Sequence, residues 1–308
     1  MNSSKNKSAA DYKAEMTKRI NLSAFAGVFI LFVNFITGVI LTKYFSEISY
    51  TVYMVFLFLN TCISMLPFLI LYHVKCEKIG KLITMPKEKR CGFPKRVMAV
   101  MLGFGLCTTV NFLTSLISTY IFNVETGTAI NKYITDIPSL CMAVLAVGIA
   151  PAVCEELLFR GCIIGSLKKY NVLMSVVISS VIFALIHSGI SGMIFAFLSG
   201  MILGFVRIYT GYFSAAVAVH FMNNALALST AAAGSLISED AGSMVFYTAG
   251  IIGIVLTLVC IILILLRKIR LDCIFSENTL HSAQPVENVV SSSSMLLVFV
   301  LCAILTDM

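Results

Sequence analysis

The chain of 308 residues is short of charge. Asp, Glu, Lys and Arg make up only 12% of it, 59% of it is apolar, and its mean hydropathy is +0.96. A soluble protein of this size carries about a quarter charged residues, because its surface faces water. The shortage excludes ordinary soluble domains and predicts a chain that crosses a lipid bilayer several times.

Other features are missing as well. The ten cysteines include no C-x-x-C pair, so they are expected to behave as small apolar residues rather than as a metal or redox motif. No internal repeat is evident. The net charge of +7 comes from basic residues placed between apolar runs. That placement is typical of membrane orientation signals and argues against a nucleic-acid partner.

Long apolar runs define the expected fold. A spanning helix needs roughly 20 apolar residues, and only helices satisfy their own backbone in lipid. The fold class predicted is therefore all-α, a polytopic membrane helical bundle of about eight transmembrane helices. The expected spans are residues 22–42, 51–72, 97–122, 137–167, 172–187, 190–208, 212–233 and 244–266.

The connections between these runs alternate in charge. The N-terminal tail 1–21 and the second loop are rich in Lys and Arg, the first and third loops are poor, and the alternation continues to Arg267. By the positive-inside rule, the N-terminus and the end of the eight-span bundle are cytoplasmic. We expect an integral, multi-pass protein, in the plasma membrane if the chain is bacterial. The polar tail 271–308 ends in a short apolar segment, residues 295–305, which is too short to span.

Two carboxylates lie inside the expected spans. Glu155 and Glu156 are the only acidic residues between Asp136 and Glu239. Each costs about 2.5–3.5 kcal/mol on insertion scales, so their presence indicates a partner or a function. Glu156 stands four residues before Arg160, the favourable order for an ion pair on one helix face. Glu155 points about 100° away, which leaves its carboxylate free for chemistry.

Further polar residues follow in later spans. Phe183-x-x-x-His187 ends one expected helix, and His220-x-x-x-Asn224 places His and Asn on one face of another. One Glu, two His and one Asn are a minimal set for activating water and stabilising an oxyanion. Pro151 predicts a break or kink just before the carboxylates. Gly200-x-x-x-Gly204 predicts a helix-packing face.

These three motifs resemble those of the CPBP intramembrane proteases, also called the Abi family, which includes the eukaryotic type II CAAX prenyl endopeptidase. The motifs are Glu155-Glu156-x-x-x-Arg160, Phe183-x-x-x-His187 and His220-x-x-x-Asn224. The resemblance covers about residues 137–233. It divides the chain into the tail 1–21, membrane helices with a basic loop in 22–136, a catalytic helical core in 137–233, a last membrane helix in 234–270, and the tail 271–308.

The resemblance implies an endopeptidase that cleaves a membrane-anchored or hydrophobic protein or peptide, with prenylated CAAX substrates as the eukaryotic precedent. It implies that Glu155 is the general base, that His187 shares this task, and that His220 and Asn224 hold the oxyanion. Glu156 and Arg160 would support them. The family is also described as metal-dependent, and Glu155, His187 and His220 are an acceptable zinc set. The helical H-E-x-x-H motif is absent, so a metal-free, glutamate-driven mechanism is preferred and zinc is the alternative.

Two functions of other classes remain as alternatives. One is a non-catalytic membrane binding module or bacteriocin-immunity factor that uses the same fold. The other is a transporter whose Glu and His residues relay protons. Transporters usually carry polar sites in paired repeats. Here the polar residues lie only in the second half of the chain, which argues against transport.

Overall fold

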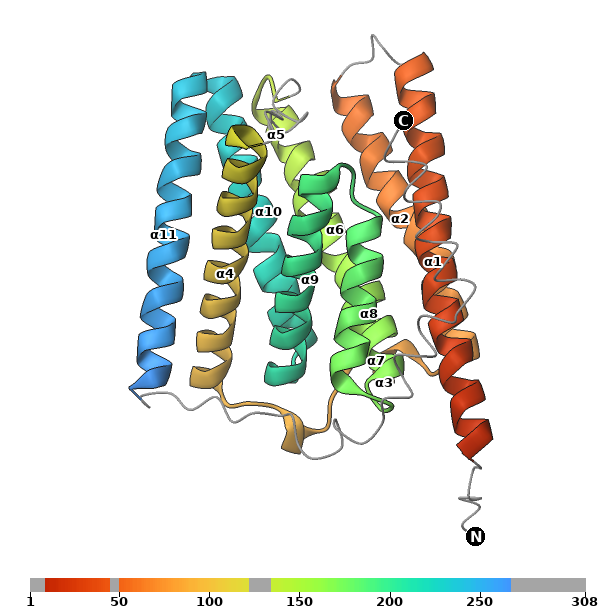
Figure 1. Cartoon of the computed structure of the whole chain (residues 1–308). Coiled ribbons are helices and arrows are strands. Elements are labelled where there is room, and N and C mark those ends of the chain that lie inside the picture. The colour runs from red at the N-terminus through yellow and green to blue at the C-terminus, as the bar shows by residue number, and fades with distance from the viewer. Residues whose placement is uncertain (1–8, 45–49, 122–133, 267–308) are drawn as a thin grey trace.

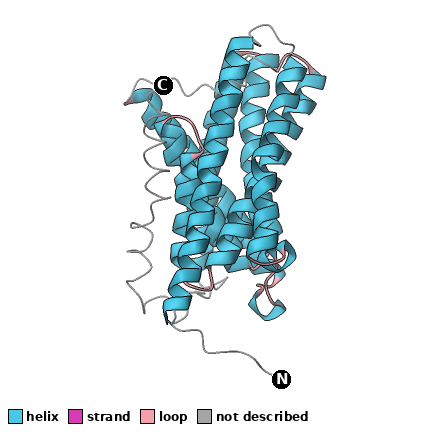
Figure 2. Ribbon diagram, turned by 90° about the vertical axis from the view of Figure 1, so that its right-hand side faces the viewer, coloured by secondary structure: helices cyan, strands magenta, loops and turns pink. Residues whose placement is uncertain are grey.

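The computed structural model describes residues 9–44, 50–121 and 134–266. Within these ranges all the regular structure is helical, and no strand occurs (Figure 2). The all-α fold class is therefore confirmed. The expected tail 271–308, including its apolar segment 295–305, lies outside the described residues.

The helices stand side by side in one bundle (Figure 1). Short 3-10 and π-helical stretches, Lys87–Lys89, Val144–Ile149 and Leu157–Ile163, lie between the α-helices. The α-helices are α1 Ala9–Tyr44, α2 Tyr50–Lys75, α3 Ile79–Ile83, α4 Phe93–Tyr120, α5 Ile137–Ala143, α6 Ala150–Glu156, α7 Ile164–Leu167, α8 Val172–Leu185, α9 Ile190–Thr210, α10 Phe213–Leu236 and α11 Glu239–Leu265.

Seven of the described helical segments are long and apolar enough to cross a membrane. The fifth of the eight expected spans, 172–187, is present only as α8, which has 14 residues. At 1.5 Å per residue it reaches about 21 Å, less than the roughly 30 Å of a hydrocarbon core. The chain turns early because Ser188 and Gly189 follow, and Gly189 adopts a φ of 71° at the start of α9. His187 therefore lies in a turn inside the bundle.

The segment that carries the two carboxylates is one continuous helix from Ile137 to Leu167. The break expected at Pro151 does not occur. Proline cannot donate a helical hydrogen bond, and the stretch before it, Val144–Ile149, widens into a π-helix, in which each bond skips one more residue. A second π-helical stretch, Leu157–Ile163, follows the carboxylates. Glu155 and Glu156 thus lie between two wide turns.

One end of the bundle is strongly basic. The segment Cys76–Gly92 lies there, and so do the start of α1 and the end of α11 (Figure 1). α1 begins at Ala9, so the expected tail 1–21 is largely helical. Glu15 on α1 pairs with Arg19 at 2.8 Å and with Lys169 at 2.9 Å, which joins α1 to the end of α7. We call this end of the bundle the basic end.

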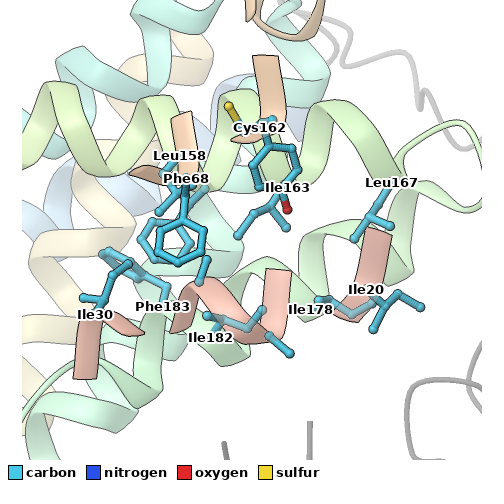
Figure 3. Close-up of a cluster of buried hydrophobic side chains, with 14 of the residues drawn as sticks. Ile20, Ile30, Phe68, Leu158, Cys162, Ile163, Leu167, Ile178, Ile182 and Phe183 are labelled. Atoms are coloured by element: carbon cyan, nitrogen blue, oxygen red, sulfur yellow. The ribbon is translucent and has the colours of Figure 1, made fainter. Parts of the chain in front are cut away.

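An apolar core joins α1, α2 and α8 to the π-helical stretch after α6. Figure 3 shows Phe68, Leu158, Cys162 and Phe183 within it, and all four side chains are buried. Cys162 behaves as a small apolar residue, as expected for the cysteines. This core holds the helix of the carboxylates against α8, and His187 lies in the turn that follows α8.

Glycines on α9 let it approach α8 closely. A Cβ atom on Gly204 would lie 2.7 Å from Cγ1 of Val176, and one on Gly200 would lie 3.2 Å from the backbone Cα of Ser180. The packing face expected from Gly200-x-x-x-Gly204 is therefore present and is directed at α8. It fixes the distance between the helix of His187 and its neighbour.

We predict that Gly204→Leu destabilises the protein, because Val176 is fully buried and cannot move aside. Overpacking of this kind costs about 1–3 kcal/mol or more. The measurement is thermal unfolding of the purified protein in detergent. Gly192→Leu on the same helix is the matched control, since a Cβ atom there meets nothing within 4 Å. Equal melting temperatures for the two variants would contradict this account of the α8–α9 contact.

Candidate active site

The two adjacent carboxylates occupy different environments. Glu156 is fully buried, whereas the side chain of Glu155 keeps 15% of its exposure. Neighbouring residues of a helix point about 100° apart, so one carboxylate can face the packed interior while the other faces an opening. Glu155 is thus accessible to a small molecule such as water, and Glu156 is not.

The ion pair expected between Glu156 and Arg160 is present. Nη1 of Arg160 donates to Oε1 of Glu156 at 2.7 Å, and both side chains have no exposure. Nη2 of Arg160 donates to the carbonyl of Gly200 at 3.3 Å, which ties this helix to α9. The guanidinium also lies 4.5 Å from the ring centroid of Phe183. Two buried charges are tolerated here because each has a partner.

His220 on α10 joins the same carboxylate, which sequence spacing did not predict. Its Nδ1 lies 2.9 Å from Oε1 of Glu156, 64 positions earlier in the chain. Because a carboxylate oxygen accepts, Nδ1 carries the proton and donates it. The other ring nitrogen, Nε2, lies 3.7 Å from Oε2 of Glu155. That distance is too long for a direct hydrogen bond. Glu156 therefore orients His220 so that Nε2 faces Glu155.

His187 is fixed in the same manner. Its Nδ1 lies 2.7 Å from the carbonyl oxygen of Phe183, so Nδ1 donates and Nε2 remains as the basic nitrogen. The imidazole packs edge-on against the Phe183 ring at 4.7 Å between centroids, and His220 approaches the same ring at 6.1 Å. Phe183 thus links the two histidines. No role was predicted for Phe183 from the sequence, although its position in the second motif, four residues before His187, indicated one.

Asn224 and Asn223 differ in their bonding. Nδ2 of Asn224 donates to the carbonyl of Val147 at 3.0 Å, in the first π-helical stretch, which uses one of its two amide protons. Asn223 is 8% exposed, and its buried Oδ1 has no hydrogen-bond partner among the described residues. Sequence reasoning missed Asn223. Buried amides without partners are rare and often mark functional sites.

The three residues considered as zinc ligands do not form a metal site as arranged. The described part of the chain contains no group of three or more His, Cys, Asp or Glu side chains that could hold a metal ion. Glu155 and His220 approach each other, whereas the contacts described for His187 are with Phe183. The described geometry therefore favours no step through a metal.

Comparison with known proteins identifies one segment of the chain. Residues 137–226 match the family model described as "Type II CAAX prenyl endopeptidase Rce1-like". No curated protein and no solved structure gives a significant match. The matched segment contains all three motifs, from Glu155 to Asn224, and agrees with the resemblance noted from the sequence.

We predict strong coupling between Glu156 and Arg160. Removing one partner of a buried ion pair costs about 3–5 kcal/mol, because the other charge remains buried and uncompensated. Arg160→Met and Glu156→Gln should each lower the unfolding free energy by about this amount, and the double variant should lose much less than the sum.

The matched control is Glu88→Gln on the exposed segment at the basic end. Surface substitutions usually change stability by no more than about 0.5 kcal/mol, so this variant should unfold close to the wild type. Chemical unfolding in detergent is measured for the wild type and the four variants. Additive losses in the double variant would show that the buried pair is not coupled.

Proposed function

We propose, starting from the match of residues 137–226 to the type II CAAX prenyl endopeptidase family model, that this protein hydrolyses a peptide bond within or beside the membrane. The observation that carries the proposal is the pairing of an accessible carboxylate, Glu155, with an oriented imidazole, His220, in the middle of an apolar bundle. Ionisable groups at such a depth are rare unless they have a function.

In the proposed mechanism, Glu155 is the general base. Its carboxylate takes a proton from water while the water oxygen attacks the carbonyl carbon of the substrate. His187 shares this task through Nε2, the ring nitrogen that Phe183 leaves free. The proton then passes to the nitrogen of the scissile bond, the C–N bond breaks, and an amine and a carboxylic acid leave. Peptide hydrolysis by this route needs no electron transfer.

His220 and Asn224 stabilise the oxyanion in this mechanism. Nε2 of His220 donates to the oxyanion when both ring nitrogens carry a proton, and Glu156 holds the ring in place through Nδ1. Asn224 contributes the amide proton that Val147 does not use. One oxyanion donor is worth about 10²–10³ in rate. Glu156 and Arg160 hold these groups in position and do not contact the substrate.

The substrate is a membrane-associated protein or peptide. Glu155 lies twelve residues before the end of α7 at Leu167, about 18 Å along the helix from the basic end. A scissile bond must therefore reach into the bundle, which suits a hydrophobic or lipid-anchored segment such as a prenylated CAAX-type peptide. We place the basic end, with the N-terminus, in the cytoplasm by the positive-inside rule, and the chain in the plasma membrane if it is bacterial. The proposed catalytic core is 137–233, supported by the helices of 22–136.

We predict that Glu155→Gln lowers proteolysis by about 10²–10⁴-fold, because the amide cannot accept the proton of water. Membrane-anchored proteins are compared in cells that carry the wild type or the variant, and the fragments that disappear identify the substrate. Glu88→Gln, on the exposed segment at the basic end, is the control and should behave as the wild type. Equal melting temperatures exclude misfolding as the cause.

The same variant tests the non-catalytic alternative. A binding module or immunity factor needs its shape and surface, which an isosteric Glu155→Gln leaves almost unchanged. Biological activity that survives in Glu155→Gln would overturn the enzymatic proposal and favour the binding module.

We predict that activity persists after metal removal. The purified enzyme is incubated with a chelator, dialysed and assayed, and zinc is then restored. Because Glu155 activates water directly in the proposed mechanism, the rates before and after stripping should agree. Loss of activity that zinc alone restores would favour the zinc alternative, with Glu155, His187 and His220 as ligands.

A further inference from the structure

The basic end contains a buried guanidinium for which no anionic partner occurs among the residues that the structure describes. Arg207, in the last turn of α9, is 1% exposed. Its Nη2 donates to the carbonyl of Ile83 at 2.7 Å, but its buried Nε and Nη1 have no hydrogen-bond partner among the described residues. By contrast, the other fully buried arginine, Arg160, is paired with a carboxylate. The charge of Arg207 therefore needs another explanation.

Two ordinary effects stabilise Arg207 only in part. The C-terminal end of a helix attracts a cation by about 0.3–1 kcal/mol. A hydrogen bond from a charged group to a carbonyl adds about 1.5–3 kcal/mol. The desolvation of a buried ion costs several kcal/mol, and each unmet donor adds to that cost. An anion close to Arg207 would remove the deficit.

Other positively charged side chains lie near the guanidinium of Arg207. The charge of Arg90 acts on Arg207, and the charges of Arg207 and Lys89 act on Lys168 at the end of α7. Burial, and then these two positive charges, lower the pKa of Lys168 to about 8. Glu77 opposes them with the smallest effect. The positive charges that act on Lys168 therefore outweigh the negative charge of Glu77.

The backbone holds these cations in place. The carbonyl of Leu82 lies 2.7 Å from where a Cβ atom on Gly165 would stand, so the segment Cys76–Gly92 crosses tightly over α7. The amide of Cys91 donates to the carbonyl of Thr210 at 3.1 Å, which joins the segment to the end of α9. Lys89 and Arg207 come from parts of the chain that these contacts fix together. The backbone positions of the cluster are thus fixed relative to one another.

We propose that the Arg207 cluster, formed by Arg207, Lys168 and Lys89, binds the phosphate group of an anionic membrane lipid. The cluster lies where membrane-crossing helices end, since Lys168 follows the segment Ile137–Leu167 and Arg207 is in the last turn of α9. Leu173, at the start of α8 at the same end, has an exposed apolar side chain. A lipid suits both features, because its phosphate meets the cations while its acyl chains stay beside apolar side chains. Basic pockets between membrane helices are known to bind anionic headgroups. This site is separate from Glu155 and does not depend on the proposed protease activity.

The test uses the full-length protein in detergent at about 0.15 M salt, where exposed charges are screened beyond about 8 Å. Thermal unfolding is followed with increasing phosphatidylglycerol, with phosphatidylcholine, and with inorganic phosphate. We expect phosphatidylglycerol to raise the melting temperature in a saturable way and the other two to have little effect. Equal stabilisation by phosphatidylcholine, or full stabilisation by inorganic phosphate alone, would overturn the lipid site.

Variants then locate the site. Lys168→Gln and Arg207→Gln should raise the half-saturating amount of phosphatidylglycerol at least about tenfold. Without lipid, Arg207→Gln should melt at the wild-type temperature or higher, because it removes an uncompensated buried charge. Lys81→Gln removes an exposed charge from the same segment and should change the lipid response no more than about twofold. If Lys81→Gln weakens the response as much as Lys168→Gln, the attraction is diffuse and the proposed site is wrong.

Discussion

One carboxylate oxygen, Oε1 of Glu156, holds the centre of this structure together. It accepts hydrogen bonds from Arg160 on its own helix and from His220 on α10. The side chains of Glu156 and Arg160 have no exposure to solvent. Because a buried carboxylate is costly without such partners, the helices that carry them cannot separate or slide without a large penalty. The carbonyl of Gly200 extends the network to α9. A polar interaction thus fixes the register of helices that are otherwise packed by apolar contacts without direction.

The same network explains why two neighbouring glutamates can do different work. The carboxylate of Glu156 is occupied by its structural contacts with buried partners. Its neighbour Glu155 keeps some exposure and faces Nε2 of His220. The π-helical stretches on both sides of the pair widen the helix where the side chains must be placed. Wide turns of this type are frequent at functional sites, because they re-aim side chains without breaking the helix. Stability and the proposed chemistry are therefore built from adjacent residues.

Charged residues of the bundle form ion pairs both in its middle and at its basic end. In the middle, Glu156 and Arg160 neutralise each other, and at the basic end Glu15 pairs with both Arg19 and Lys169. Arg207 departs from this arrangement, since its guanidinium is nearly as deeply buried as that of Arg160 and has no ion pair with a carboxylate in the part of the chain that the structure describes. A protein this poor in charge has little reason to bury one without a use. Lipid phosphate at the membrane surface would supply the missing negative charge.

The sequence by itself determined what local chemistry controls. Apolar runs gave the all-helical bundle and the approximate spans, and the four-residue spacing gave the Glu156–Arg160 pair, because both partners lie on one helix face. Only the tertiary structure decided that His220 binds Glu156, that α8 is too short to span, and that the helix passes through Pro151. These features depend on how separate helices pack and turn. Helical periodicity relates residues within one helix and carries no information about which faces of distant helices meet.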